Sequence, residues 1–147
     1  MPITIEELRD VTDDVVDAFA RLVPQLSSSA KSLDAAAIKD IVSSSAVTVL
    51  LARNDNDTIV GTTTLVTFRI PTGARAWIED VIVDDSARGQ GVGMLLTEEA
   101  LKLAKESGAR TVDLTTRPSR VAAGRLYERA GFTQRDTRVY RYSFDFE

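Results

Sequence analysis

The sequence contains neither cysteine nor histidine among its 147 residues. Without cysteine there can be no disulfide, no thiolate metal site and no cysteine nucleophile. Without histidine the chain lacks the most common general base and the most common metal ligand. Acid–base chemistry would therefore fall to carboxylates, tyrosine, lysine or water, and we expect no metal site.

Long apolar runs and excess positive charge are also lacking. No apolar run approaches the roughly 18 residues that suggest a membrane span, and the first residues lack the charged and apolar segments of a secretory leader. The formal net charge is −4, which argues against nucleic acid as the main partner. We therefore expect a cytoplasmic protein with neither a membrane nor a nucleic-acid partner.

The remaining composition is that of one globular domain. The chain is 44% hydrophobic and 27% charged, and no low-complexity linker or internal repeat divides it. This length can bury a core without disulfides or metals, so we expect a single domain over residues 1–147. Arginines crowd residues 117–141. They form either a solvated basic face or a set of contacts to an anionic ligand.

Residues 77–96 have the pattern of a strand, a glycine-rich turn and a helix. The segment 77–83 is mostly apolar, three alternate glycines occupy positions 89, 91 and 93, and apolar residues then recur at helical spacing. Alternate glycines let the backbone approach a ligand, and the N–H groups of a first helical turn point toward it. Arg88 adds a positive charge suited to phosphate oxygens. This pattern predicts a pyrophosphate-binding turn.

Two common phosphate motifs do not fit this turn. A P-loop would place lysine and then serine or threonine after its glycines, and none follows here. A dinucleotide fingerprint would place a third glycine where Met94 stands. The pattern that does fit is Arg88-x-x-Gly91-x-Gly93 directly after a strand, which resembles the acetyl-CoA-binding motif of the GNAT superfamily of N-acetyltransferases. A nucleotide binder of another kind stays a less favoured alternative.

The resemblance extends beyond the glycine turn. Residues 78–83, Ile-Glu-Asp-Val-Ile-Val, look like the fourth strand of the family. Residues 119–132 look like its C-terminal signature, A-x-x-L-Y-x-x-x-G-F, carried here by Ala123, Leu126, Tyr127, Gly131 and Phe132. These motifs follow one another in the family's order and spacing over about residues 75–135. The sequence is therefore similar to the GNAT superfamily.

A mixed sheet is expected on two grounds. Hairpin patterns come first and strand–helix–strand patterns later, which favours a mixed sheet with helices on both faces. The resemblance implies an α/β (α+β) fold with a mostly antiparallel sheet of six to seven strands and about four helices. Strands are expected at residues 3–8, 47–53, 59–68, 77–83, 111–115 and 139–146. Helices are expected after Thr12 or Asp13, after Asp34, over about residues 91–106 and from Pro118–Ser119. The last strand should bury one aromatic face, made of Tyr140, Tyr142, Phe144 and Phe146.

The resemblance implies an acyl-CoA N-acyltransferase in which a primary amine attacks the thioester of acetyl-CoA directly. Such an amine, with a pKa near ~10, must lose a proton. The family often places a glutamate in its fourth strand, so Glu79 is the expected base, acting directly or through water. Asp80 is the alternative base, and a structural salt bridge is the alternative role for either carboxylate. The expected acid is Tyr127, which many relatives direct toward the CoA sulfur, although a core tyrosine is the simpler role.

The cofactor contacts are also carried over from the resemblance. Backbone groups of the fourth strand should bind the pantetheine arm and supply the oxyanion donor, at Val81, Ile82 and Val83. The pyrophosphate should bind the amides of Gly89, Gln90, Gly91, Val92 and Gly93, with Arg88 nearby. Many relatives have asparagine where Arg120 stands here, so Arg120 either contacts a phosphate or has no cofactor role.

The acceptor amine cannot be read from the sequence. In the family it depends on the loop between the first two helices, here about residues 24–33, and on the segment before the last strand, here about residues 133–138. A small molecule or a peptide is possible, and polyamines, aminoglycosides and phosphorylated amino sugars all stay open. A catalytically inactive CoA-binding or sensing module is the alternative function. Many relatives pair through C-terminal strands, so a homodimer is possible.

Overall fold

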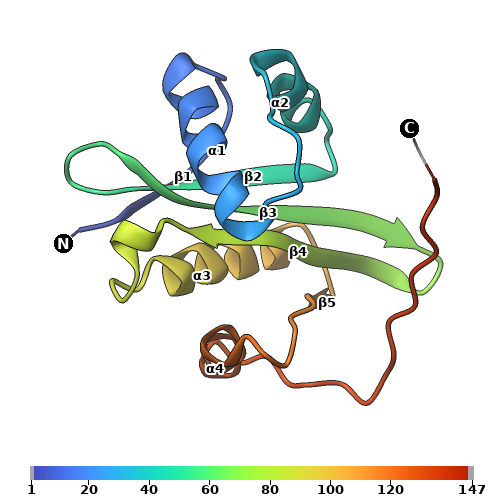
Figure 1. Ribbon diagram of the computed structural model, residues 1–147. Coiled ribbons are helices and arrows are strands. Elements are labelled where there is room, and N and C mark those ends of the chain that lie inside the picture. Colours follow the sequence, from blue (N-terminus) through green and yellow to red (C-terminus); the bar gives the residue numbers. More distant parts are fainter. Residues whose placement is uncertain (1, 146–147) are drawn as a thin grey trace.

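The computed structural model describes residues 2–145, in which the elements follow the order β1-α1-α2-β2-β3-β4-η1-α3-β5-α4 (Figure 1). The helices are α1 (Asp13–Leu26), α2 (Ala35–Val42), α3 (Val92–Glu106) and α4 (Val121–Arg129), with a short 3-10 turn, η1 (Asp85–Ala87). The strands are β1 (Thr4–Glu7), β2 (Val47–Arg53), β3 (Ile59–Ile70), β4 (Gly73–Val83) and β5 (Thr111–Asp113). None of these helices is long and apolar enough to cross a bilayer.

Within residues 2–145 the sheet has five strands in the order β1-β2-β3-β4-β5. Neighbouring strands are antiparallel except β4 and β5, which are parallel. The helices α1 and α2 cover one face of the sheet, and α3 covers the other (Figure 1). The mixed, mostly antiparallel fold with four helices on both faces is thus confirmed, with fewer strands than expected.

Each face of the sheet buries its own apolar cluster. Leu50 packs in the cluster beneath α3, together with Leu65, Ile78 and Leu96. Its neighbour Leu51 packs in the cluster beneath α1 and α2. Successive side chains of a strand point to opposite faces, so a strand buried on both sides reads as a continuous apolar run. This explains the sequence of β2, whose residues 49–52 are all buried.

Local sequence signals account for the starts of the first two helices. The carboxylates of Asp13 and Asp14 lie in the first turn of α1, where they complement the positive end of the helix dipole. The side chain of Asp34 accepts a hydrogen bond from the Ala37 amide at 2.8 Å and so caps α2, as expected. Thr12 is the residue before α1, but its side chain makes no capping hydrogen bond.

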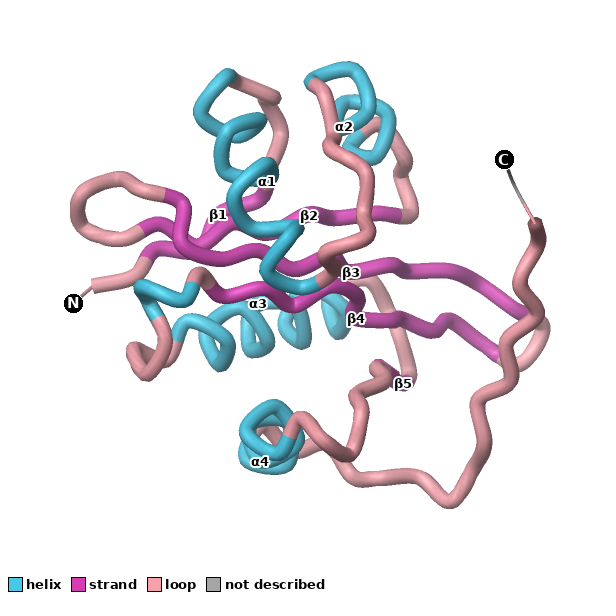
Figure 2. The backbone as a smooth tube through the Cα atoms, in the orientation of Figure 1, coloured by secondary structure: helices cyan, strands magenta, loops and turns pink. Residues whose placement is uncertain are grey.

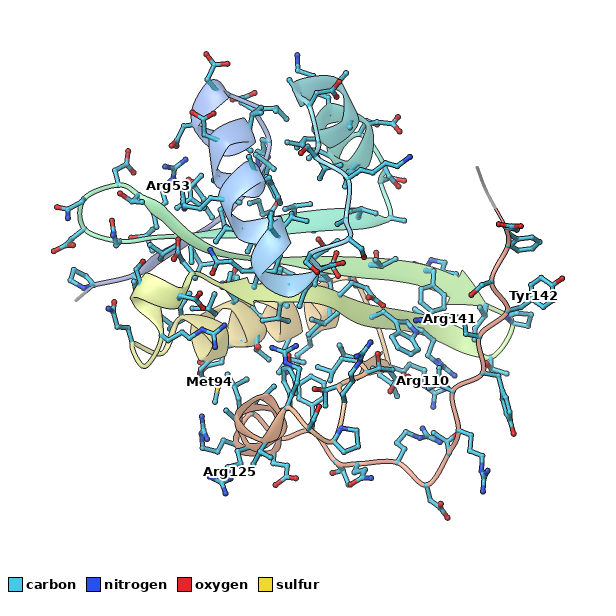
Figure 3. The ribbon with its side chains drawn as sticks, viewed as in Figure 1. Arg53, Met94, Arg110, Arg125, Arg141 and Tyr142 are labelled. Carbon is cyan, nitrogen blue, oxygen red and sulfur yellow. The ribbon has the colours of Figure 1, made fainter. Side chains whose placement is uncertain are left out.

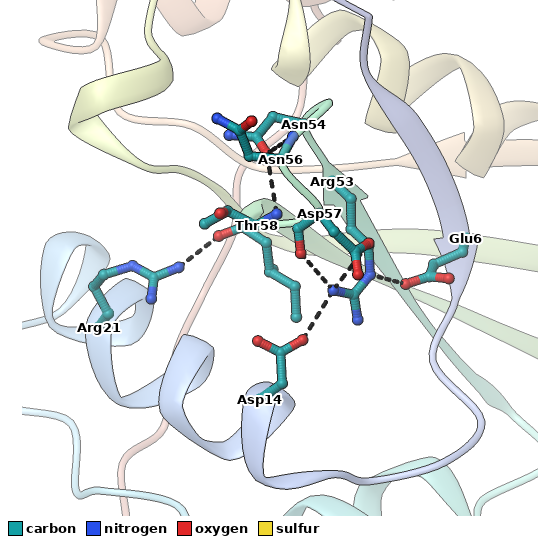
Figure 4. A network of polar contacts seen from close by, with 9 residues as sticks. Glu6, Asp14, Arg21, Arg53, Asn54, Asn56, Asp57 and Thr58 are labelled. Atoms are coloured by element: carbon teal, nitrogen blue, oxygen red, sulfur yellow. Dashed lines mark hydrogen bonds and ion pairs between the residues drawn. The ribbon is translucent and has the colours of Figure 1, made fainter.

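A polar network fastens the β2–β3 hairpin to the rest of the N-terminal half (Figure 4). The guanidinium of Arg53 forms ion pairs with Glu6 of β1 and with Asp14 of α1. The hydrogen bond that Arg53 donates to the Glu6 carboxylate is the main reason that the pKa of Arg53 is raised. In the turn itself, the Asn54 side chain accepts hydrogen bonds from the amides of Asn56 and Thr58, both at 3.0 Å. The network links β1, α1 and the turn of the β2–β3 hairpin.

The expected last strand is wrong. Residues 133–145 form no strand or helix (Figure 2), and Tyr140 and Tyr142 are 87% and 82% exposed. The side chain of Tyr142 points away from the sheet (Figure 3). The rings of Tyr142 and Phe144 contact each other at 5.1 Å, and Phe146 lies outside the described residues. Aromatic residues at every second position show that a segment suits a strand, but a strand also needs the edge of a neighbouring strand to pair with. No strand within the described residues pairs with this segment, and its aromatic face is not buried.

Candidate functional site

The ladder between β3 and β4 contains a bulge. Thr62 pairs with Ile82 and Thr64 pairs with Glu79, so one residue of β3 opposes two residues of β4. Asp80, one of those two, has a φ of 52°. This left-handed conformation costs a residue other than glycine roughly 1 kcal/mol, and aspartate tolerates it better than most. Such strained residues concentrate at functional sites.

The bulge brings both candidate carboxylates to one face of the sheet. Without it, Glu79 and Asp80 would point to opposite faces. Asp80 lines a cavity on the side of α1 and α2, and Glu79 lies across the ladder from Thr64, which lines the same cavity. The side chain of Val81 packs toward the core on the α3 side. Both carboxylates are exposed, and neither has an ion pair within the described residues.

The cavity has a volume of about 300 Å³ and lies between the sheet, α1, α2 and the loop that joins the helices. The loop contributes Ala30, Lys31 and Leu33, which belong to the segment 24–33. The segment 133–138 contributes no side chain to it. Sequence reasoning missed Lys31 and Thr64, because no local signal shows which loop or strand residues will face a cavity.

One edge of β4 is open along its second half. The parallel ladder between β4 and β5 includes only Arg75 to Trp77 of β4 and ends at Trp77 opposite Asp113. From residue 78 to residue 83, β4 pairs with β3 on one side, and no described strand pairs with it on the other. An open strand edge carries N–H and C=O groups that can pair with an extended ligand. The expected pantetheine residues, Val81, Ile82 and Val83, all lie in this open part.

The entry to the glycine turn is held by Asp84. Its carboxylate accepts hydrogen bonds from the amide and the hydroxyl of Ser86, both at 3.1 Å, and pairs with Arg21 of α1 at 3.0 Å. Burial raises the pKa of Asp84, but the hydrogen bonds from Ser86 and the pairing with Arg21 outweigh it and lower the pKa overall. Asp84 is therefore a charged anchor that links the end of β4 to α1.

The glycine turn presents unpaired amides to open space. Gly89 and Gly91 have φ angles of 80° and 78°, and a Cβ atom on either would meet nothing within 4 Å. Gly91 is the residue before α3, and no side chain caps this helix end. The amides of Gly89, Gln90, Gly91, Val92 and Gly93 have no hydrogen-bond acceptor within the described residues. Unpaired amides at the positive end of a helix dipole make a site for an anion.

The third glycine of the turn has a second function in packing. A Cβ atom on Gly93 would lie 2.9 Å from Cδ1 of Leu126, a residue of α4. Glycine at this position therefore lets α4 approach the first turn of α3. The signature residue Leu126 is thus in direct contact with the glycine motif, although more than 30 residues separate them in the sequence.

The two arginines expected near the phosphates, Arg88 and Arg120, have different surroundings. Arg88 pairs with Asp85 at 3.0 Å, and both side chains are mostly exposed, so this pair is weak and leaves the Arg88 guanidinium accessible to an anion. Arg120 is exposed and is the residue before α4. Its positive charge is close enough to the Tyr127 hydroxyl to oppose the effect of burial on the pKa of that group.

Tyr127 is buried, with 8% of its surface exposed, and its ring contacts Phe132 edge to face at 5.9 Å. Burial raises its pKa, with Arg120 acting in the opposite direction, so the phenol stays protonated at neutral pH. Its hydroxyl has no hydrogen-bond partner within residues 2–145. Every fully buried side-chain oxygen of these residues does have a partner, so the Tyr127 hydroxyl is not fully buried. The hydroxyl oxygen therefore reaches solvent while the ring is part of the core. A buried ring with an accessible, protonated hydroxyl suits a proton donor.

The residues at the open edge and at the glycine turn fit a CoA thioester. The free amides suit a diphosphate, and the open edge of β4 suits a pantetheine arm with two amide groups. Within residues 2–145 no cluster of three acidic, histidine or cysteine residues is placed to hold a metal ion.

Comparisons with known proteins agree with this geometry. The acetyltransferase (GNAT) family model matches residues 12–132. The chain is 38% identical over 71 residues to N-alpha-acetyltransferase 30 of Schizosaccharomyces pombe, a match covering 48% of this chain and 47% of that protein. It is 34% identical over 65 residues to the probable glucosamine 6-phosphate N-acetyltransferase 2 of Oryza sativa, covering 44% of this chain and 37% of that protein. The chain thus spans less than half the length of these curated relatives.

Solved structures share the fold over nearly the whole chain. Glucosamine-6-phosphate N-acetyltransferase from Arabidopsis thaliana has a TM-score of 0.82 at 21% identity, over 99% of this chain and 100% of that one. A transcriptional regulator from Bacillus halodurans has a TM-score of 0.81 at 27% identity, over 97% and 100%. The first likeness, at so low an identity, shows the fold alone. Because the family model covers most of the sequence, the chain belongs to the acetyltransferase (GNAT) family.

Proposed function

We propose that the protein transfers an acetyl group from acetyl-CoA to a primary amine of a small molecule or peptide. One observation carries the proposal: the unpaired amides of residues 89–93 follow the open edge of β4 after the short turn η1. This arrangement suits a ligand that joins a diphosphate to a pantetheine arm. The names of the two curated relatives, both N-acetyltransferases, support an amine as the acceptor.

In the proposed complex the diphosphate accepts hydrogen bonds from the amides of Gly89 to Gly93, with Arg88 as the nearby cation. Arg120, at the start of α4, is a second candidate contact for a phosphate. The pantetheine arm pairs with the backbone of Val81, Ile82 and Val83 along the open edge. The thioester then lies close to the bulge of β4.

The proposed reaction needs one base, one oxyanion donor and one acid. Glu79 takes a proton from the acceptor ammonium group, directly or through water, and the free amine attacks the thioester carbonyl. The oxyanion is stabilised by a backbone N–H of the segment 81–83. A C–N bond forms and the C–S bond breaks, and the CoA thiolate takes a proton from Tyr127. The nitrogen loses its second proton through water, which restores the Tyr127 phenol, and Glu79 releases its proton to solvent. Asp80, on the same face of the sheet, is the alternative base.

The test measures free CoA thiol released when acetyl-CoA meets a broad panel of amines. Glu79→Gln should lower kcat by roughly 10²- to 10⁴-fold, the usual contribution of a general base, without changing the Kd for CoA. Asp80→Asn is the parallel variant, because asparagine also tolerates a positive φ. Glu98→Gln, a change of an exposed glutamate on α3, is the matched control and should have no effect.

Three results would contradict the proposal in different ways. If Glu79→Gln and Asp80→Asn both kept the full rate, the carboxylates would have no catalytic role. If CoA bound but no amine released thiol above background hydrolysis, the protein would be an inactive CoA-binding module. If ATP or NAD bound more tightly than CoA, the glycine turn would serve another nucleotide.

A homodimer is proposed from the C-terminal segment. Val139, Tyr140 and Tyr142 are 71%, 87% and 82% exposed in a segment whose alternation suits a strand. The three-residue strand β5 is the last of the sheet within the described residues, so its outer edge is open. We propose that the segment pairs with a second copy of the chain. Sedimentation velocity should show a dimer that a Tyr140→Ser, Tyr142→Ser variant weakens, and a wild-type monomer at all concentrations would contradict it.

A further inference from the structure

The walls of the cavity beneath α1 and α2 are mostly apolar. Phe19 and Val23 of α1, Leu33 of the following loop and Ile41 of α2 line one side, and the sheet supplies further aliphatic side chains. The volume of about 300 Å³ is at the lower end of the range for ligand sites. The cavity therefore suits a small ligand with an apolar body.

Few polar groups face this cavity. The hydroxyl of Thr62 is already used, since it donates a hydrogen bond to the Leu50 carbonyl at 2.8 Å. Thr64, Lys31 and Asp80 remain, and none of the three has a hydrogen-bond or ion-pair partner for its side chain within the described residues. Lys31 and Asp80 contribute one cation and one anion, and Glu79, on the same face of the sheet at the bulge, is the other carboxylate of the site.

This scarcity of polar groups disfavours two classes of amine. A polyamine or an aminoglycoside carries several ammonium groups. The two carboxylates of the site both lie at the bulge, the aliphatic wall offers the other ammonium groups no partner, and Lys31 repels them. A phosphorylated amino sugar carries hydroxyl groups that lose their water on binding, and an aliphatic wall cannot replace those hydrogen bonds. Burying an apolar arm against the same wall is favourable.

We infer that the acceptor is a primary monoamine on an apolar arm, either a linear or branched alkyl chain or an aryl-alkyl group. This inference rests on the proposed acetyl transfer. The amine group binds beside Asp80 at the bulge, close to Glu79, and the arm lies among Phe19, Val23, Leu33 and Ile41. The site thus selects by apolar length rather than by a pattern of hydrogen bonds.

The first experiment measures kcat/KM for a series of n-alkylamines and for 2-phenylethylamine, spermidine, kanamycin and glucosamine 6-phosphate. Along the alkyl series kcat/KM should rise about fourfold per methylene until the cavity is full, the factor that corresponds to burying one methylene. The best apolar amine should exceed each of the three polar acceptors by at least tenfold. A polar acceptor that proved best would overturn the inference while leaving the acetyl transfer established.

Two matched variants test whether the acceptor binds in this cavity. Ile41→Ser changes a cavity residue that is 38% exposed, and Ile70→Ser changes an isoleucine at the end of β3 that is 42% exposed and does not line the cavity. Ile41→Ser should flatten the dependence on chain length and leave the KM for acetyl-CoA unchanged, whereas Ile70→Ser should leave both unchanged. Equal effects of the two variants would overturn the assignment to this cavity.

A complete lack of turnover would count against the proposed function, and binding then tests the inference alone. In a calorimetric titration, n-hexylamine should bind to the wild-type protein and to Ile70→Ser, and more weakly to Ile41→Ser. No measurable uptake of n-hexylamine by folded wild-type protein would overturn the inference.

Discussion

Replacing Gly91 by glutamate tests the anion site with little ambiguity, because the same helix offers a control. Gly91 precedes α3 and Gly108 follows it, with φ angles of 78° and 88°, and a Cβ atom on either would meet nothing within 4 Å. A glutamate at either position pays the same backbone cost, about 1 kcal/mol. For a domain of this size that cost lowers Tm by roughly 3 °C.

The two variants should differ sharply in cofactor affinity. A carboxylate about 4 Å from a phosphate charge is repelled by roughly 1 kcal/mol in bulk water and roughly 4 kcal/mol near a protein surface. Gly91→Glu should therefore raise the Kd for CoA by about 5-fold to several hundred-fold, and Gly108→Glu should leave it unchanged. A glutamate near the start of a helix also complements the dipole, so Gly91→Glu should be at least as stable as Gly108→Glu.

The assay is isothermal titration of CoA at two salt concentrations, with thermal melting as the check of folding. Salt screens charge repulsion, so the affinity lost in Gly91→Glu should partly return at high ionic strength. Gly91→Gln has the same bulk without the charge and separates steric block from repulsion. A folded Gly91→Glu protein that binds CoA as the wild type does would refute the assignment of the diphosphate to this turn.

Further expectations concern Tyr127, Asp80 and Asp84. Tyr127→Phe should lower kcat and leave the Kd for CoA nearly unchanged. Because burial raises the pKa of Tyr127, the kcat of the wild type should fall only above about pH 10. The variant, which has no phenol to titrate, should not show this fall. Asp80→Gly should be about 1 kcal/mol more stable to urea than Asp80→Ala, since only glycine adopts the φ of 52° without strain. Asp84 has a lowered pKa in the folded protein, so its stabilising contribution is complete above its unfolded value of about 3.9 and is lost as pH falls through the folded value. The urea midpoints of wild type and Asp84→Asn should therefore differ at pH 7 and converge at strongly acid pH.

The two faces of the sheet have separate functions in the proposed reaction. In that proposal the α3 face, which carries the glycine turn and α4, binds the cofactor. The opposite face, which carries the cavity beneath α1 and α2, binds the acceptor. The strand β4 connects the two proposed sites, because its open edge is available to the cofactor while its bulge brings Glu79 and Asp80 to the face of the cavity.

Local signals in the sequence were sufficient for most of the fold and for the conformation of the glycine turn. Glycine at positions 89 and 91 marks left-handed backbone whatever surrounds it, and Asp34 caps a helix through contacts within four residues. The hairpin of β2 and β3 is likewise encoded by a turn cluster between two apolar runs. These features depend on neighbours along the chain, and this is why the pattern alone predicted them.

Contacts between distant segments decided the rest. The bulge at Asp80 depends on the register of β3 against β4, which at this point pairs residues 15 and 20 positions apart. The face of the sheet on which each carboxylate lies could therefore not be read from alternation. The cavity needs α1, α2 and three strands together, and no stretch of sequence encodes its outline. The aromatic segment at the C-terminus is a case in which the sequence pattern predicted a strand that the tertiary structure does not form. Its pattern suits a strand, but only a partner edge in three dimensions makes it one.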